Sequence, residues 1–399
     1  MSIDITDLAQ PFDPAAVWKL LPNQPRLLAL GEPTHGEADL LDLRNELFQY
    51  LVEQAGYRTI AIESDCLMGL VVDGYVTTGA GELDEVMVRG LSHGFGDAAG
   101  NRELVRWLRS YNQGRPAAEQ VHFAGFDGPL EITGAASPRQ ALTGLYGYLA
   151  ARVDPELLPC DPETLDRLIG ADDRWPNPAA MMDPGASVGR TPDAARLRLI
   201  ADDLVALLDT ELPRLAATSA PAELELARLH GRTAIGLLRY HRRMADRSPG
   251  RMASLLAQRA AMMAENLLAL ADRGPTLVFA HNAHLQRTKS SLRMGEHRPE
   301  WWSAGAIVSN RLGDRYAFLA TAIGTIRHRG VDTPPPDTVE GLMYGLPADR
   351  SMVDAGRLAA RCGDSVAARE SPWFGYAGLD PAHLAGIDGL LFIKDLTAR

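Results

Sequence analysis

The sequence is poor in cysteine and has no excess of positive charge. Its three cysteines, Cys66, Cys160 and Cys362, are widely spaced and odd in number, so neither a disulfide framework nor a CxxC metal site is predicted. The 399 residues include 40 lysines and arginines against 51 aspartates and glutamates, a net charge of −11. Because nucleic-acid binding requires a basic face, no nucleic-acid partner is expected, and an anionic membrane surface is disfavoured too.

Long apolar runs are also lacking. No stretch approaches the 18 consecutive apolar residues typical of a transmembrane helix. The opening residues, MSIDITDLAQPF, have neither the basic segment nor the apolar core of a signal peptide. We therefore expect a soluble, cytoplasmic protein with no membrane partner, and the oligomeric state stays open.

The composition is that of an ordinary globular protein, with 46% hydrophobic and 23% charged residues. The chain is long enough to form two domains. Short apolar runs have the length of buried parallel strands. Between the first two runs, DLLDLRNELFQYLVEQA (39–55) has apolar residues at 40, 43, 47 and 51, the spacing of one helix face. Strand, helix, strand is a βαβ unit, so the sequence predicts an α/β fold with a mainly parallel sheet flanked by helices. The predicted strands are 27–30, 59–62, 121–126, 276–280, 316–323 and 390–393.

The middle of the chain has almost no strand pattern. Helical segments are predicted at 193–218, 222–246 and 252–272, and 170–192 is typical of a loop because it is rich in Pro, Gly, Asp and Met. We interpret 138–272 as a helical subdomain inserted into an α/β core formed by 1–137 and 273–399. A cluster of arginines on the second helix is interpreted as a solvated face: Arg239, Arg242, Arg243 and Arg247.

Acids and histidines follow four of the predicted strands. The first stretch, ALGEPTHGE (29–37), places two carboxylates and an imidazole directly after a buried run. Because ligands of open α/β sheets bind beyond the carboxyl ends of the strands, we predict that these side chains form one site. They are Glu32 and His35 after the first run, Glu63 and Asp65 after the second, Asp127 after the third, and His281 and His284 after the fourth.

Each of these residues also has a structural interpretation. Glu32 could interact with the start of the following helix, and Glu63 and Asp65 could cap the next segment. Asp127 precedes Gly-Pro and could be a turn residue, and the two histidines could be satisfied at a strand end. The joint occurrence after four strands favours a site.

Three mechanisms could use such residues. GLSHG (90–94) matches the G-x-S-x-G of a serine hydrolase, with Ser92 as nucleophile. That elbow needs a strand before the serine and a helix directly after it, whereas ELDEVMVR before it has helical spacing and a glycine-rich loop follows. This context argues against Ser92 as a nucleophile.

The second mechanism is a metal-dependent hydrolase, because H-x-x-H with carboxylates could hold zinc or manganese. The third is metal-free activation of water by His35, made more basic by Glu32 or Glu63, with a second histidine or an arginine stabilising the oxyanion. No cofactor is predicted, and a divalent metal stays an alternative.

Several motifs together resemble the erythromycin esterase family. GEPTHGEADLLDLRNEL, IAIESD, WLRSYN, FAGFD, MAENL and FAHNAHL occur in that family's order and approximate spacing. The resemblance covers about residues 25–399, and the pair GE-x-T-H-G and A-H-N-A-H is its specific signature. It implies a mixed α/β core with a helical insertion, the two forming a deep cleft, and hydrolysis of macrolide lactones.

The resemblance also implies roles for individual residues. His35 corresponds to the histidine regarded as the base that activates water, and the other matching residues line the same cleft: Glu32, Glu63, His281 and His284. Arg259, four residues before MAEN, matches a recurrent arginine that could face the pocket. Metal dependence is not uniform in the family.

The segment SHGFGDAAGNRE departs from the macrolide-active members. Gly100 falls near the place of a large aromatic residue, so we expect a smaller, more flexible wall there, and His93 could add a polar group. The sequence thus predicts an esterase that cleaves an ester or lactone of a macrolide-like or other small secondary metabolite, with Asp65, His93, Asp127 and Arg259 contacting substrate. The alternatives are a non-hydrolytic elimination or cyclisation in the same cleft, and a binding protein without catalysis.

Overall fold

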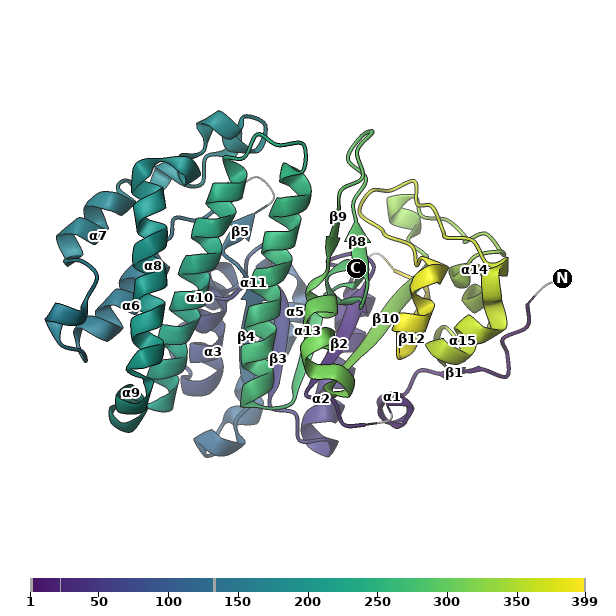
Figure 1. Ribbon diagram of the computed structural model, residues 1–399. Coiled ribbons are helices and arrows are strands. Elements are labelled where there is room, and N and C mark those ends of the chain that lie inside the picture. The colour runs from purple at the N-terminus through teal and green to yellow at the C-terminus, as the bar shows by residue number, and fades with distance from the viewer. Residues whose placement is uncertain (1–2, 22, 132–133, 398–399) are drawn as a thin grey trace. The chain divides into compact units, whose positions relative to one another are not determined.

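The computed structural model describes residues 3–21, 23–131 and 134–397 (Figure 1). The chain forms two compact units. The first comprises residues 1–126, 267–292 and 302–399, and the second comprises 127–266 and 293–301. The units therefore divide at 126/127 and 266/267, whereas the sequence predicts boundaries at 137/138 and 272/273. In addition, residues 293–301, in the returning part of the chain, belong to the second unit.

The first unit is built on an eight-stranded sheet in the order β1–β11–β12–β10–β2–β7–β3–β4. The strands β12, β10, β2, β7 and β3 pair in parallel, while β1 and β11 pair antiparallel at one edge. The predicted mainly parallel sheet is confirmed, and its six predicted strands are present. The strands are β1 (Ala9–Pro11), β2 (Leu27–Glu32), β3 (Thr59–Asp65), β4 (His122–Asp127), β7 (Thr276–His281), β10 (Tyr316–Thr325), β11 (Arg350–Asp354) and β12 (Gly389–Asp395).

Helices cover both faces of this sheet. On one face, side chains such as Leu30, Ile62 and Phe279 join Leu47 and Leu108 in a single apolar cluster. These last two residues come from α2 (Ala38–Gln54) and α5 (Ala99–Asn112), and α3 (Gly69–Thr78) and α4 (Leu83–Gly90) contribute to the same cluster. On the other face, α12 (Asn282–Leu285) contacts β2 and β10, and α13 (Ala304–Leu312) contacts β10. Helix α13 is seen beside these strands in Figure 1.

The remaining elements of the first unit are short. They are α1 (Pro14–Leu20), β8 (Lys289–Ser291), α14 (Val339–Tyr344) and α15 (Ala355–Cys362), and β9 (Glu300–Trp302) lies at the boundary with the second unit. Every residue of β2 and of β10 is buried, as expected for the central strands of a sheet covered on both faces.

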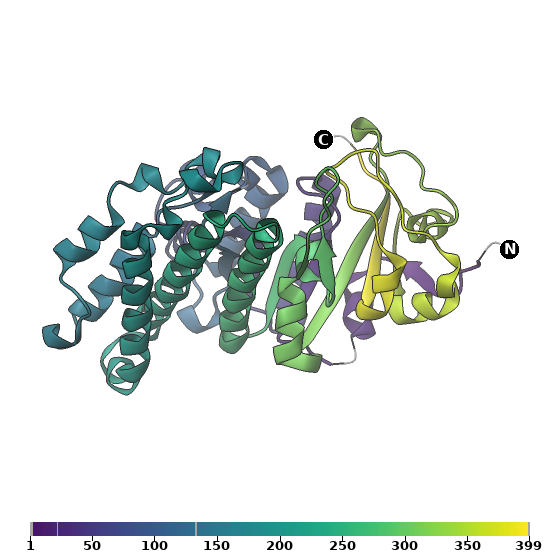
Figure 2. The ribbon, with the colours of Figure 1, turned by 45° about the horizontal axis from the view of Figure 1, so that its top comes forward.

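The second unit is helical (Figure 2). It contains α6 (Arg139–Ala150), α7 (Pro162–Ile169), α8 (Pro192–Thr210), α9 (Leu212–Thr218), α10 (Pro221–Met244) and most of α11 (Arg251–Arg273), with the two-residue strands β5 (Leu130–Glu131) and β6 (Gly134–Ala135). The helix predicted at 193–218 is two helices, because Pro213 occupies the first turn of α9 and starts a new helix better than it continues one. The predicted loop at 170–192 is a series of short 3-10 turns.

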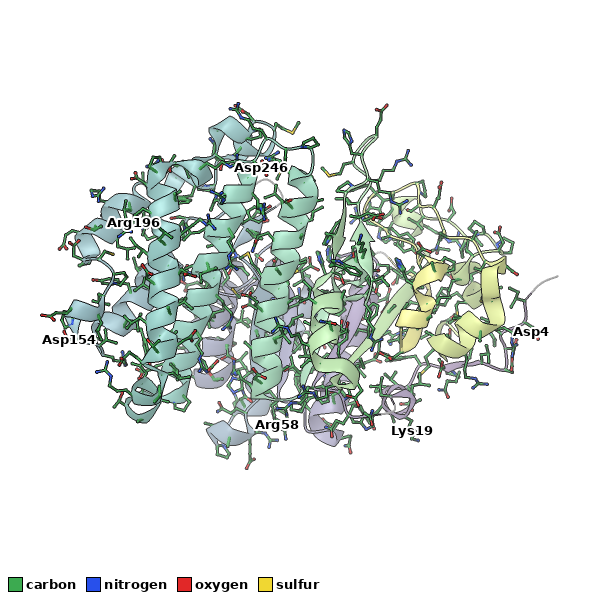
Figure 3. The ribbon with its side chains drawn as sticks, viewed as in Figure 1. Asp4, Lys19, Arg58, Asp154, Arg196 and Asp246 are labelled. Atoms are coloured by element: carbon green, nitrogen blue, oxygen red, sulfur yellow. The ribbon has the colours of Figure 1, made fainter. Side chains whose placement is uncertain are left out.

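Several charged side chains lie on the outside of each unit. Asp4 and Lys19 of the first unit and Asp154 and Arg196 of the second point away from the ribbon (Figure 3). Among the residues described, no helix is both long and apolar enough to cross a bilayer.

Candidate active site

Three neighbouring parallel strands end at the same edge of the sheet. These are β2, β7 and β3, which lie next to one another in that order. Glu32 at the end of β2 is the register partner of His281 at the end of β7, and Glu63 lies near the end of β3. The predicted convergence of these residues at one edge is therefore what the sheet order produces.

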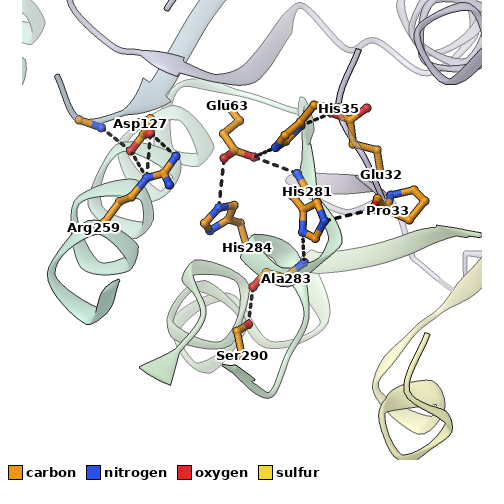
Figure 4. Close-up of polar contacts among 11 residues, drawn as sticks. Glu32, Pro33, His35, Glu63, Asp127, Arg259, His281, Ala283, His284 and Ser290 are labelled. Carbon is orange, nitrogen blue, oxygen red and sulfur yellow. Dashed lines mark hydrogen bonds and ion pairs between the residues drawn. The ribbon is translucent and has the colours of Figure 1, made fainter. Parts of the chain in front are cut away.

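His35 and Glu32 form a hydrogen-bonded pair in the turn after β2. His35 Nδ1 lies 2.7 Å from Glu32 Oε1 (Figure 4). The turn is possible because Gly36 adopts a φ of 81°, a conformation that glycine accepts without strain. The imidazole side chain is 39% exposed and the carboxylate only 4% exposed, so a buried carboxylate orients a partly exposed imidazole.

Glu63 links this pair to the HNAH segment. Its Oε2 accepts a hydrogen bond of 2.9 Å from the backbone N–H of His281 and lies 4.0 Å from His35 Nε2. Its Oε1 lies 3.1 Å from His284 Nε2 (Figure 4). A single buried carboxylate thus fixes the positions of residues from β7 and α12 next to the imidazole of His35.

His281 is held by the backbone through both ring nitrogens. Its Nδ1 accepts a hydrogen bond from Ala283 N, and its Nε2 lies 3.2 Å from the carbonyl oxygen of Pro33. The proton of the neutral ring therefore resides on Nε2. Burial, followed by the charge of His35, lowers the pKa of His281 to about 3, so the ring is neutral at physiological pH and joins the β2 turn to α12.

Two buried polar atoms of the site have no hydrogen-bond partner among the described residues. They are Glu32 Oε2 and His284 Nδ1. Such atoms are rare in folded proteins, and they mark places where a substrate or water can bind. Burial raises the pKa of Glu32, and the hydrogen bond and charge of His35 oppose that rise.

Arg44 is a buried cation behind Glu32 that the sequence analysis does not identify. It is 1% exposed, and its guanidinium donates to Asn101 Oδ1 at 2.7 Å, to Asn45 Oδ1 at 2.8 Å and to the carbonyl of Gly100 at 3.3 Å. Burial lowers its pKa to about 10, so it remains protonated at neutral pH, and the charge of Glu32 opposes that shift. The sequence holds one signal that could have identified Arg44. It lies next to residue 43, on the face of α2 that the apolar spacing assigns to the core.

A small cavity lies between these two charges. It measures about 20 Å³ and is lined by Glu32, Arg44, Glu63 and Phe95, among others. That volume is roughly what one water molecule needs.

Gly100 does not open the wall of the site as expected. It is buried in α5, where an added Cβ would come within 2.6 Å of Leu41 Cβ. Its carbonyl also accepts hydrogen bonds from Arg44 and Asn45. The absence of a side chain therefore allows α5 to pack closely against α2, and the expectation of a more flexible wall at this position is wrong.

Ser92 has a structural environment rather than that of a nucleophile. Helix α4 precedes it, not a strand. Its Oγ accepts a hydrogen bond from Asp65 N at 2.9 Å and pairs with Ser64 Oγ at 3.1 Å, while its own N–H donates to Ser64 Oγ. These reciprocal bonds attach the loop after α4 to the end of β3.

This loop places an aromatic ring against His35. The ring centroids of Phe95 and His35 are 5.4 Å apart, and those of Phe95 and His93 are 5.7 Å apart. His93 has a φ of 58° and is the only non-glycine residue with positive φ among those described. With the 5.5 Å separation of His35 and His281, these rings form a row along the edge of the site.

Asp65 caps the segment that follows β3. Its Oδ1 accepts hydrogen bonds from Leu67 N and Met68 N. This geometry supports the interpretation of Asp65 as a residue that caps the next segment.

Asp127 and Arg259 belong to the second unit and form an ion pair in which the carboxylate is fully buried and the arginine partly exposed. Arg259 Nη2 lies 2.7 Å from Asp127 Oδ2, and Arg259 Nε lies 3.0 Å from the same oxygen (Figure 4). Asp127 also accepts a hydrogen bond from Gly128 N. Within this unit the pair fixes the start of the chain after β4 to α11.

The described residues include no group of three or more His, Cys, Asp or Glu side chains arranged to hold a metal ion. The donor atoms of the site are largely engaged with one another, as the contacts of Glu63 and His281 illustrate.

Solved structures show the same fold at low sequence identity. A Bacillus cereus protein superposes with a TM-score of 0.74 at 19% identity, covering 98% of this chain and 96% of that one. A succinoglycan biosynthesis protein gives 0.72 at 17% identity, over 98% and 96% of the two chains. An erythromycin esterase, EreC, solved as a histidine-to-asparagine variant in its open conformation, gives 0.68 at 16% identity, over 99% and 97%.

Sequence comparison gives a more specific result. Erythromycin esterase type II of Escherichia coli is 33% identical over 104 residues, which span only 26% of this chain and 24% of that protein. The family model for erythromycin esterase matches residues 52–375, well over half of the sequence. The chain therefore belongs to the erythromycin esterase family, a membership that supports a hydrolase of the esterase type.

Proposed function

We propose that the protein hydrolyses an ester or lactone of a macrolide-like or other secondary metabolite, with His35 as the general base that activates water. One observation carries this proposal. His35 Nδ1 is bound to Glu32, while its Nε2 faces Glu63 Oε2 across 4.0 Å.

The bond to Glu32 decides which nitrogen is the base. With Glu32 ionised, the proton resides on Nδ1 and the lone pair on Nε2. The 4.0 Å between Nε2 and Glu63 is too long for a direct hydrogen bond, but a water molecule can bridge such a gap. In that position water donates to both atoms, and its oxygen attacks the ester carbonyl as Nε2 takes a proton. General-base catalysis of this kind contributes roughly 10²–10⁴ in rate.

His284 is suited to the negative charge that develops in the reaction. Glu63 holds its Nε2, and its Nδ1 has no partner among the described residues. When protonated, His284 donates from Nδ1 to the developing oxyanion or to the leaving alkoxide. His281 then acts as a positioning residue, because both of its nitrogens are engaged by the backbone.

Mass spectrometry of reactions in ¹⁸O-labelled water tests the proposal. A panel of macrolide lactones and simple esters is incubated with the wild type and with His35→Ala. We expect one labelled oxygen in the carboxylate product and a loss of at least about 10² in turnover for the variant.

A product without the label, or of unchanged mass, would instead support base-catalysed elimination or cyclisation. Ligand binding without turnover in either protein would support a binding protein.

A further inference from the structure

The second unit carries a group of four neighbouring arginines whose side chains have no charged partner among the described residues. They are Arg198 on α8 and Arg239, Arg242 and Arg243 on α10. None of the four guanidinium groups makes an ion pair or a hydrogen bond with a residue in the described part of the chain. In a chain with a net charge of −11, a group of uncompensated cations is unexpected.

The fold brings these four side chains together. Residues 239, 242 and 243 have the i, i+3 and i+4 spacing that places side chains on one face of a helix, and α8 packs against α10. The pKa of Arg198 is lowered, first by its burial and then by the positive charges of Arg242, Arg239 and Arg243. The structure therefore holds like charges close together, an arrangement that is unfavourable without an anion.

A hollow lies beside these arginines. It has a volume of about 250 Å³ and is lined by Arg198, Arg239, Asp202 and the apolar side chains of Leu199, Ile235 and Leu238. This is below the usual range for drug-sized ligands, and it fits a compact ligand. Asp202 is the one carboxylate that lines the hollow, so the two arginines that line it, Arg198 and Arg239, exceed it in charge.

The nearby carboxylate of Asp246 is engaged elsewhere. It lies 3.0 Å from Arg190 Nη2 and accepts a hydrogen bond from Ser248 N. Arg247, which follows the end of α10, lies next to Gly185. Asp246 therefore does not neutralise the four arginines, and Arg247 adds a further positive charge to this end of α10.

We propose that this cluster binds a small multivalent oxyanion, such as a ligand bearing linked phosphate groups or several carboxylates. Guanidinium groups match both anions because they donate two parallel hydrogen bonds to a pair of oxygens. The site belongs to the second unit alone and is independent of the proposed esterase reaction.

Isothermal titration calorimetry of the full-length protein with inorganic triphosphate and with citrate tests this site. In 150 mM NaCl we expect saturable binding of at least one of the two, and the preferred anion distinguishes phosphate from carboxylate chemistry. Each of Arg198→Gln and Arg239→Gln should weaken binding by about 10-fold or more, and the triple variant Arg239→Gln, Arg242→Gln, Arg243→Gln should abolish it.

The matched control removes three arginines that already have carboxylate partners in the same unit. These are Arg152, Arg214 and Arg228, which pair with Glu223, Glu211 and Glu225. Their triple Gln variant should bind the anion within about twofold of the wild type. Equal loss in both triple variants would show a general charge effect and would overturn the proposal.

Thermal unfolding without ligand gives a second readout. Removing repulsion between like charges should raise the unfolding midpoint temperature of the cluster variant above that of the wild type. The midpoint of the control variant should not rise. A lowered midpoint for the cluster variant would overturn the inference. Binding of polyglutamate without binding of triphosphate or citrate would also overturn it, because the surface would then recognise an acidic protein segment.

Discussion

The 2.7 Å contact between His35 Nδ1 and Glu32 Oε1 joins the most exposed base of the site to one of its most buried acids. Burial raises the pKa of Glu32, so this carboxyl takes up a proton at a pH above its ordinary value of 4.5. Protonation reverses the hydrogen bond and moves the imidazole proton to Nε2, where it blocks the proposed base.

The first prediction concerns Glu32→Gln. The amide oxygen can still accept from Nδ1, but the negative charge that favours the imidazolium form is lost. We expect turnover to fall by roughly 10², the lower end of a general-base contribution, and the acidic limb of the pH–rate profile to move to lower pH. Measuring kcat/KM from pH 4 to 9 checks this, with Glu46→Gln, an exposed acid of α2, as control. An unchanged profile would contradict the proposed role of Glu32.

The second prediction concerns Ser92→Ala. If Ser92 only attaches the loop to β3, the variant should keep its activity within about tenfold and form no acyl-enzyme. Loss of a nucleophilic serine would instead cost about 10⁶ in kcat. We also expect the free energy of unfolding to fall by about 1–3 kcal/mol, because buried donors lose their acceptor.

Ser64→Ala removes the same hydroxyl pair from the other side and leaves Ser92 N, instead of Asp65 N, without its acceptor. It should therefore have a similar cost in urea denaturation and a similar effect on activity. Strong inactivation by Ser92→Ala alone would revive the serine-hydrolase interpretation.

The central sheet, and the edge of it where the site lies, could be predicted because both depend on the pattern of apolar and polar residues within short segments. Apolar runs bounded by polar residues indicated β2, β3, β7 and β10, and parallel strands bring their carboxyl ends to one edge. Glu32, Glu63 and His281 followed from that geometry. Strand β11, which lies between β1 and β12, was missed because Arg350–Asp354 is short and shows no clear alternation of apolar and polar residues.

Residues that act across long sequence separations were harder to predict. Arg44 lies on a helix face that apolar spacing assigns to the core, and only its contacts with Asn101 and Gly100 explain why a cation is buried there. The pairing of Ser64 with Ser92 joins residues 28 positions apart. Gly100 was misinterpreted for a related reason, because its close packing against Leu41 depends on where α5 lies on α2.

The third prediction concerns Arg44→Met. Removing this cation leaves the side-chain oxygens of Asn45 and Asn101 without their donor and Glu32 without its nearby positive charge. Breaking buried charge networks from one side typically costs about 3–5 kcal/mol, and we expect a loss of that size in urea denaturation.

A double-mutant cycle isolates the part of this loss that depends on Glu32. Combined with Glu32→Gln, Arg44→Met should cost less than the sum of the single changes. The control is Arg58→Met, whose guanidinium donates to the carbonyls of Val52 and Tyr57 and whose effect should add to that of Glu32→Gln. Additive behaviour of Arg44 would contradict the electrostatic link.

The fourth prediction is that activity does not depend on a bound divalent metal. Both nitrogens of His281 and both oxygens of Glu63 already have partners in the site, so a metal would have to displace them. Elemental analysis of the purified protein and assays after dialysis against EDTA check this. Activity lost on chelation and restored by zinc or manganese would establish the metal-dependent alternative.

The fifth prediction concerns pH and stability through His241 of the second unit. Its ring is 2% exposed, lies against Trp175, and has Nε2 at 2.9 Å from the carbonyl oxygen of Ala136. Burial lowers its pKa from 6.5 to about 4. Between these values the unfolded chain holds a proton that the folded chain does not, so stability is complete above pH 6.5 and is lost as the pH falls toward 4.

For this shift, linkage predicts a loss of about 2 kcal/mol in unfolding free energy between pH 7 and pH 5. His241→Gln retains a donor for Ala136 but does not titrate, so the wild type should lose about 2 kcal/mol more than this variant over the same interval. Urea denaturation at both pH values measures the difference, and His297→Gln, at an exposed position, should behave as the wild type does. Equal losses in wild type and His241→Gln would mean that the buried imidazole does not set the acid sensitivity of the helical unit.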